Sequence, residues 1–194
     1  VLNRLITVRS DATTFAPVVL GLHVRDEDLV NLKYLTELVV LDLGHMRITN
    51  CDFLWEMTKM EYLILVETYI TDISPVANMK NLKFLEIFLS PVKDYTPLLS
   101  CTALEDLNIC YTRGDLKTLE QMTWLKNLWW GHNRGTGLSW DQQQMLREAI
   151  PGCYFDFTSP SSTGGGWREA DVYFEMRNLF GMFYQPGGTG MDNN

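Results

Sequence analysis

Histidine and carboxylate side chains that recur at a fixed spacing are the residues of this sequence that could bind a metal ion. His45 and Glu67 are 22 residues apart, and His132 falls in the same column if the chain repeats with about that period. Neighbouring strands of a parallel sheet would place His45 and Glu67 about 4.8 Å apart. Leu89 and Tyr111 occupy the column before His132, so no third ligand is close. We therefore expect an exposed cross-strand pair, with no metal and no other cofactor.

Carboxylates suited to acid–base catalysis are also present. Asp42, Glu86 and Asp106 share one predicted face with Glu67, and we interpret them as a solvated acidic surface. No nucleophile elbow, phosphate-binding loop, dinucleotide fingerprint, zinc-protease motif or calcium loop occurs in the sequence. The sequence therefore predicts no catalytic residue and no enzymatic activity.

The four cysteines show no C-x-x-C pairing and no zinc-ligand spacing, so we interpret them as structural thiols. Cys51 and Cys101 align with apolar columns of the repeat described below, which predicts that both are buried, reduced and well separated. Cys110 falls on the opposite face of a predicted strand, where we expect a reactive thiol.

Composition excludes two classes of partner. The chain has 194 residues, a net charge of −8 and 46% hydrophobic residues, which is typical of a folded globular protein. Nucleic-acid binding depends on Lys and Arg to displace counterions, so the acidic balance argues against it. No run of 18 residues is free of charge, so we expect no membrane insertion.

An internal repeat positions all of these residues. The motif L-x-x-L-x-L occurs five times with a period of 22 residues, shortened to 21 at the last step. Its middle column consists of Leu41, Leu63, Leu85, Leu107 and Leu128. The column two residues later consists of Leu43, Leu65, Ile87, Ile109 and Trp130. One unit of this length cannot bury its apolar face alone, so the units must stack to form a continuous core.

This pattern resembles the leucine-rich-repeat family, in particular the short 22-residue class of bacterial internalin-like proteins, over about residues 18–133. The resemblance implies an α/β solenoid with a curved parallel β-sheet on its concave side and short helical turns on its convex side. It also implies a bacterial protein that is secreted or displayed on the cell surface.

The sequence departs from the family at the position that usually holds Asn. Met46, Thr68, Ser90 and Thr112 stand there, and Asn returns at Asn133. Hydroxyl groups can bond turn backbone as Asn does, but Met46 cannot, so we expect a looser turn in the first full repeat. On the convex side, Ser74-Pro75 and Thr96-Pro97 predict short helical turns with the hydroxyl residue as N-cap.

The ends of the solenoid need caps. We predict an N-terminal cap and a degenerate first strand in residues 1–24, with strands at Leu5–Val8 and Pro17–Val24 and a degraded repeat at Leu20-Gly21-Leu22. The repeats span 25–133, a C-terminal α/β cap spans 134–184, and residues 185–194 form a flexible tail.

The predicted C-terminal cap contains two helices and a strand. Ser139-x-x-Gln142 is a capping box that begins a helix ending near Ile150, and a strand follows at Cys153–Phe157. We expect Trp140 to seal the last repeat. Apolar residues at Val172, Met176, Leu179, Phe180 and Phe183 predict an amphipathic helix that packs back onto that repeat.

The concave face carries the most informative residues. Alternation along each strand directs the residues between the core leucines outward. Those positions include an apolar and aromatic group: Tyr62, Ile64, Phe84, Phe88, Leu89, Tyr111 and Trp129. A contiguous exposed surface of this kind is typical of an interface. An alternative is that one end of the chain folds over the face, and homodimerisation through it is another.

We therefore predict a non-catalytic interaction module that binds a protein or peptide ligand on the concave face through these seven residues. One alternative is carbohydrate or cell-wall binding by the same aromatic side chains. A second is an uncharacterised enzyme activity in the C-terminal segment.

Overall fold

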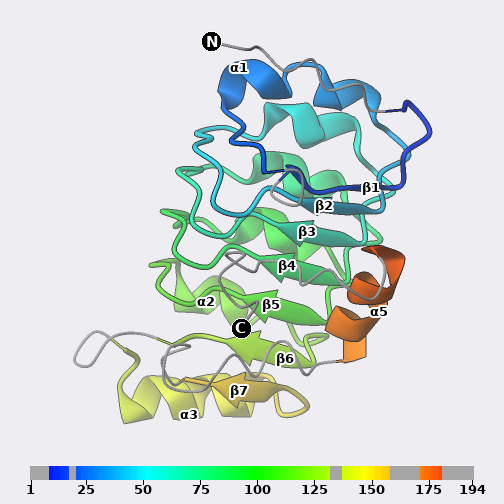
Figure 1. Ribbon diagram of the computed structural model, residues 1–194. Coiled ribbons are helices and arrows are strands. Elements are labelled where there is room, and N and C mark those ends of the chain that lie inside the picture. The colour runs from blue at the N-terminus through cyan, green and yellow to red at the C-terminus, as the bar shows by residue number, and fades with distance from the viewer. Residues whose placement is uncertain (1–8, 18–20, 132–136, 158–170, 181–194) are drawn as a thin grey trace, which may run out of the picture.

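The computed structural model describes residues 9–17, 21–131, 137–157 and 171–180, which form an open arc of stacked coils (Figure 1). One parallel sheet lines the inside of the arc, with its seven strands in chain order. The strands are β1 (Thr14–Phe15), β2 (Val40–Asp42), β3 (Tyr62–Ile64), β4 (Phe84–Glu86), β5 (Asp106–Asn108), β6 (Asn127–Trp129) and β7 (Tyr154–Asp156).

The repeat period sets the register of this sheet. Leu41 pairs with Leu63, and the same column continues through Leu85, Leu107 and Leu128. All five side chains are fully buried in the core between the sheet and the convex turns. Trp130, which replaces a leucine in the next column, is buried there as well. The predicted leucine-rich-repeat solenoid is confirmed.

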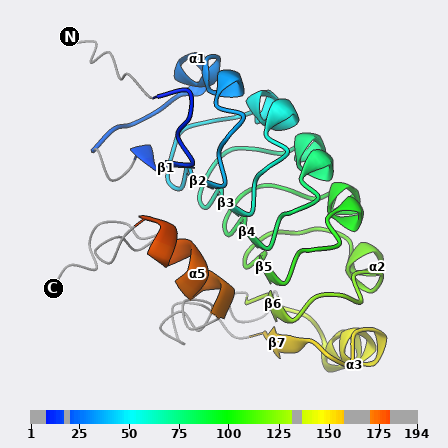
Figure 2. The ribbon, with the colours of Figure 1, turned by 90° about the vertical axis from the view of Figure 1, so that its right-hand side faces the viewer.

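Short helical turns return the chain along the convex side, as Figure 2 shows. They are α1 (Asp26–Leu29), α2 (Leu116–Leu119) and the 3-10 helices η2 (Leu32–Tyr34), η3 (Asp52–Glu56), η4 (Ser74–Asn78) and η5 (Thr96–Ser100). The capping group of η4 and η5 differs from our expectation. Asp72 Oδ1 accepts from the backbone N–H of Ser74 and Asp94 Oδ1 from that of Thr96, each at 2.8 Å, so carboxylates satisfy these donors in place of hydroxyls.

The first strand also differs from the prediction. β1 lies at Thr14–Phe15 and pairs with β2 through Phe15 and Leu41, 26 residues apart, so the first coil is longer than the repeats that follow it up to β6. The strand expected at Pro17–Val24 is not found in its described part, because neither Pro17 nor residues 21–24 belong to a strand and Gly21 adopts a left-handed turn with φ of 64°. Residues 18–20, which include Leu20 of the expected degraded repeat, lie outside the described residues. The strand predicted at Leu5–Val8 lies outside the described residues.

A left-handed residue follows the strand in four successive repeats. His45, Glu67, Leu89 and Tyr111 have φ between 53° and 61°. Residue types other than Gly and Asn rarely adopt this backbone conformation. The hydroxyl at the next position bonds nearby backbone as predicted, since Thr68 Oγ1 donates to the Leu65 carbonyl at 2.9 Å.

The turn at Met46 is closed in the same way as its counterparts. The Met46 N–H donates to the Leu43 carbonyl at 3.2 Å, and the equivalent bond from Ser90 to Ile87 measures 3.1 Å. Met46 is buried, and its sulfur accepts from the N–H of Val24 at 3.3 Å. The looser turn that we expected is therefore not found.

The C-terminal elements divide between two places. α3 (Trp140–Ala149) begins with the predicted capping box, in which Ser139 Oγ accepts from the Gln142 N–H at 3.2 Å. β7 then adds to the end of the sheet beside β6. Trp140 does not seal the last repeat, because 71% of it is exposed, and Leu146, Ile150 and Phe155 fill the core there. The last described element, α5 (Asp171–Phe180), lies elsewhere.

Candidate functional site

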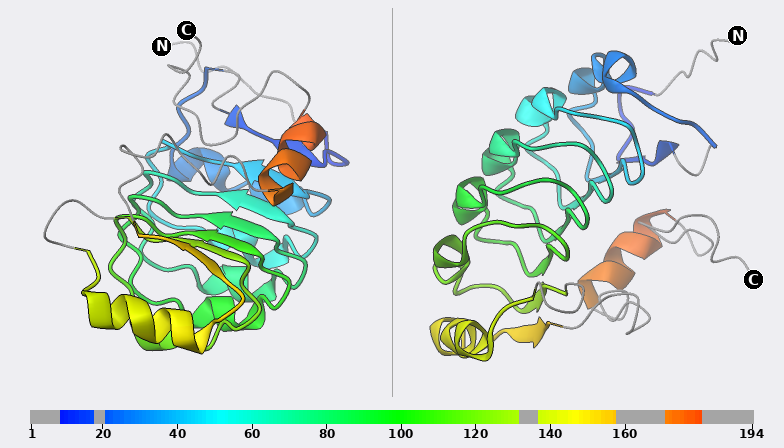
Figure 3. Two further views of the ribbon diagram at one scale, coloured as in Figure 1. Left: turned by 90° about the horizontal axis from the view of Figure 1, so that it is seen from below. Right: turned by 90° about the vertical axis from the view of Figure 1, so that its left-hand side faces the viewer.

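α5 lies inside the arc, on the concave face of the sheet (Figures 2 and 3). Its Val172, Tyr173 and Met176 are buried against side chains of the sheet in a second apolar cluster, which we call the inner cluster. The sheet residues of the inner cluster are Val40, Tyr62, Ile64, Val66, Phe84, Cys110 and Trp129.

Ring packing and polar contacts fix α5 near the beginnings of β3 and β4. The rings of Tyr173 and Phe84 meet at 6.1 Å between centroids with a 57° tilt. The Tyr62 hydroxyl donates to the Glu175 carboxylate at 2.9 Å. Lys83 Nζ lies 2.9 Å from Glu61 and 3.9 Å from Glu175, so the ammonium bridges the sheet and the helix. Burial, followed by the bond to Glu175, raises the pKa of Tyr62 far above its ordinary value.

This packing buries four of the seven residues that we predicted to bind a ligand. Tyr62, Ile64, Phe84 and Trp129 are at most 3% exposed, so our expectation that they face solvent is wrong. The alternative, in which one end of the chain folds over the concave face, accounts for their burial. The helix reaches further than we expected: the inner cluster includes Trp129 of the last repeat, and α5 also contacts Tyr62 of β3 and Phe84 of β4.

Cys110 shares the inner cluster. Its side chain is 1% exposed, and burial raises the pKa of the thiol to about 12, so the predicted reactive thiol is not found. Cys51 and Cys101 are buried and free, as predicted. Their thiols donate to the carbonyls of Asp72 and Val76, at 3.1 Å and 3.3 Å.

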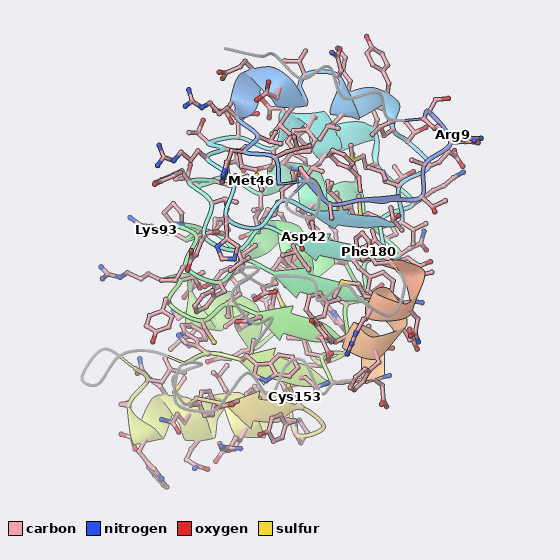
Figure 4. The ribbon with its side chains drawn as sticks, viewed as in Figure 1. Arg9, Asp42, Met46, Lys93, Cys153 and Phe180 are labelled. Atoms are coloured by element: carbon pink, nitrogen blue, oxygen red, sulfur yellow. The ribbon has the colours of Figure 1, made fainter. Side chains whose placement is uncertain are left out.

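Three predicted binding residues remain accessible beyond the inner cluster, at the ends of β4 and β5. Phe88 and Tyr111 are half-buried and form an edge-to-face pair with centroids 5.5 Å apart. Leu89 is 43% exposed. Leu89 and Tyr111 line a cavity of about 310 Å³ with Pro91, Val92, Lys93 and Arg113, among other residues. We call Phe88, Leu89 and Tyr111 the open patch. Lys93, beside it, is labelled in Figure 4 on the side of the solenoid opposite α5.

The acidic residues of the concave face are not the solvated surface that we expected. Asp42, Glu86 and Asp106 are at most 1% exposed. Asp42 Oδ1 accepts from the Gly44 N–H at 2.8 Å, and Glu86 Oε1 accepts from Asn108 at 3.3 Å. Figure 4 labels Asp42 on the inner side of the sheet. The error arose because strand alternation identifies a face but not what covers it.

Asp106 is the most perturbed of these carboxyl groups. One of its oxygens accepts from the Asn127 side chain, and the other has no hydrogen-bond partner within the described part of the chain. Burial raises its pKa to about 7, and the neighbouring carboxylates of Glu105 and Asp171 act in the same direction. A carboxyl group with this pKa can exchange a proton near neutrality, but the side chain of Asp106 is closed to solvent in this structure.

The predicted pair of His45 and Glu67 is present. His45 Nδ1 lies 2.8 Å from Glu67 Oε2, and Nε2 of the same ring has no hydrogen-bond partner within the part of the chain that the structure describes. Across the described ranges, no three His, Cys, Asp or Glu side chains are grouped closely enough to hold a metal ion. His132, the third member of the column, lies outside these ranges.

The sequence alone missed α5 residues Tyr173 and Glu175 as partners of the concave face. The apolar spacing of Val172, Met176 and Phe180 identified the helix but could not identify its partner. None of the helices that the structure describes has the length and apolar character to cross a membrane.

Comparison with known proteins supports the fold independently. No protein-family model and no curated protein matches the chain. A solved internalin (inlF) of Listeria monocytogenes is 27% identical with a TM-score of 0.52, over 64% of this chain and 42% of that one. Internalin C2 of the same bacterium is 23% identical with a TM-score of 0.55, over 66% and 54%. A leucine-rich-repeat protein of Leptospira interrogans is 21% identical with a TM-score of 0.56, over 65% and 33%.

The chain is thus similar to internalins and other leucine-rich-repeat proteins, and a bacterial origin fits these matches. It spans about half of each neighbour or less. The likeness supports a protein-interaction module in general and identifies neither a partner nor a binding face.

Proposed function

We propose that this internalin-like leucine-rich-repeat chain is a non-catalytic module, secreted or displayed on the cell surface, that binds a protein or peptide on the concave side. The open patch of Phe88, Leu89 and Tyr111 makes the direct contact. Tyr62, Ile64, Phe84 and Trp129, which we first expected in that role, form its buried floor together with α5.

The exposure of Leu89 beside two aromatic side chains is the observation that carries this proposal. Leu89 holds a left-handed φ of 57° while 43% of it is exposed, so it combines backbone strain with a poorly buried apolar side chain. Gly or Asn would relieve the strain, which costs about 1 kcal/mol or more in residues of this type. A residue that is unfavourable for stability at an exposed position is typical of a functional surface. Its aromatic neighbours Phe88 and Tyr111 are of the type enriched at interfaces.

A catalytic role has no comparable support. The carboxyl group suited to proton transfer, Asp106, is buried beneath α5. General acid–base catalysis needs the catalytic group within hydrogen-bonding reach of the substrate. We therefore favour binding over the enzymatic alternative.

Selection of peptides from a displayed random library on the intact chain tests the proposal. The affinities of the selected peptides are then measured for the wild type, for the double variant Leu89→Ser, Tyr111→Ser and for the control Tyr34→Ser. Tyr34 is 66% exposed and lies on η2 of the convex side, so the control removes an exposed aromatic side chain away from the patch.

We expect the double variant to bind at least about tenfold more weakly, because an interface anchor contributes about 2 kcal/mol. The control should stay within about twofold of the wild type. Equal binding by the double variant would refute the open patch as the binding surface. If a glycan array gives saturable binding that the double variant loses while no peptide is selected, the carbohydrate alternative replaces the proposal.

A further inference from the structure

A basic pocket of about 420 Å³ opens at the β-bridge between Arg25 and Arg47, beyond the end of β2. It is lined by His23, Val24, Arg25, His45 and Arg47. Met46, between the last two of these, is labelled in Figure 4 on the side of the solenoid opposite α5. The pocket thus lies in the first two coils.

The backbone of two neighbouring coils brings the four basic side chains together. Arg25 and Arg47 face each other in a parallel β-bridge, so their backbones are about 4.8 Å apart. Val24 and Met46 are buried on the inner side, whereas the flanking basic residues are exposed or half-buried. Alternation about these two inward residues directs both arginines and both histidines outward.

The acidic groups around the pocket are engaged elsewhere. Asp26 accepts from the backbone N–H and hydroxyl of Thr49, at 2.8 Å and 2.6 Å. The Asp28 carboxylate accepts from the backbone N–H of Arg25 at 3.0 Å and does not meet its guanidinium as an ion pair. Neither guanidinium takes part in any salt bridge among the described residues.

His45 adds a directed polar atom. The Glu67 carboxylate holds its ring through Nδ1 at 2.8 Å, which leaves Nε2 as the remaining hydrogen-bonding atom of the imidazole. That nitrogen is shielded from solvent and has no hydrogen-bond partner among the described residues, although shielded polar atoms are normally hydrogen-bonded. Two guanidinium groups that form no salt bridge with the described residues line this small pocket together with two imidazoles, and they constitute a site for negative charge in a chain whose net charge is −8.

We propose that this pocket binds a phosphate or sulfate group carried on a small organic molecule. The planar donor forks of Arg25 and Arg47 match the oxygens of such a group, and the imidazole of His45 lines the same pocket. The volume of about 420 Å³ is within the range of small-molecule sites, so the pocket has room for the organic part beside Val24. This site is independent of the open patch.

Titration of the intact chain with phenyl phosphate, phenyl sulfate, inorganic phosphate and phenol tests the proposal by proton NMR of the imidazole resonances. The chain has three histidines, and the variants His23→Gln and His45→Gln assign the two that line the pocket. Binding is compared among the wild type, the double variant Arg25→Gln, Arg47→Gln, the variant Arg47→Lys and the control Lys117→Gln. Lys117 is exposed on α2, so the control removes one positive charge away from the pocket.

We expect saturable shifts of both resonances with at least one phenyl ester, and weaker binding of inorganic phosphate. The double variant should lose at least about tenfold in affinity, because hydrogen bonds to charged groups are removed. Arg47→Lys should bind with intermediate affinity, since it keeps the charge but not the fork, and Lys117→Gln should match the wild type. Stronger binding of the phosphate or the sulfate ester identifies the preferred group. The proposal is overturned if neither ester binds, if phenol binds as well as the esters, or if the correctly folded double variant keeps its affinity.

Discussion

Replacement of Asp106 by Asn should make the stability of the chain less dependent on pH. Asp106 is 1% exposed, one of its carboxyl oxygens has no partner within the described residues, and its pKa is raised to about 7, chiefly by burial. Asn resembles the protonated carboxyl group in shape and charge, so the variant removes the cost of a buried negative charge.

The sign and size of the effect follow from the two pKa values. The folded chain holds the Asp106 proton up to a pH of about 7, whereas the unfolded chain loses it near the ordinary value of 3.8. The folded state therefore binds more protons in this window, and the free energy of unfolding falls as pH rises from about 4 to about 7. At 1.36 kcal/mol for each pH unit, the contribution of Asp106 to that fall is about 4 kcal/mol.

Urea unfolding followed by tryptophan fluorescence, at several pH values between about 4 and about 8, measures this contribution. The stability of Asp106→Asn minus that of the wild type should be smallest near pH 4 and increase by up to about 4 kcal/mol toward pH 8. A difference that is constant with pH, or that decreases as pH rises, would refute the reasoning.

Asp94→Asn is the matched control, because Asp94 changes the free energy of unfolding with pH in the opposite direction. Hydrogen bonds from Thr96 lower the pKa of Asp94, so this carboxylate stabilises the folded chain above its ordinary pKa, and the contribution is lost as pH falls through the lowered value. The control variant should therefore lose more stability at neutral pH than in acid.

Three further substitutions test packing, hydrogen bonding and strain by the midpoint of thermal unfolding. Met176→Ala should destabilise the chain by about 2–5 kcal/mol, because Met176 is fully buried between α5 and the sheet. An unchanged unfolding midpoint would show that α5 contributes no packing energy. Tyr95→Phe should lower the free energy of unfolding by about 1–3 kcal/mol. The buried Tyr95 hydroxyl is hydrogen-bonded to the Thr112 hydroxyl at 2.5 Å and accepts from the Gly114 N–H at 3.0 Å. An unchanged midpoint would contradict these hydrogen bonds. Leu89→Asn should raise stability by about 0.5–1 kcal/mol by relieving the left-handed strain, and a loss would argue that Leu89 is held by packing.

The sequence by itself determined the solenoid and its register. The column from Leu41 to Leu128 predicted every central strand pair, because each coil contacts only its neighbours and a 22-residue period places the same position of each coil side by side. The capping box at Ser139 was equally readable, since both of its partners lie within one turn of helix. Local and periodic contacts of this kind can be predicted from the spacing of residues along the sequence.

Only the tertiary structure decided what covers the concave face. The spacing of Val172 and Met176 required an apolar partner for α5, but every apolar column of the solenoid could have supplied one. The bond that fixes the choice joins Tyr62 to Glu175 across 113 residues, and no local pattern connects positions so far apart. The same contact buries Tyr62 and Phe84 and leaves Leu89 accessible, because a helix of ten residues covers only part of a seven-stranded sheet.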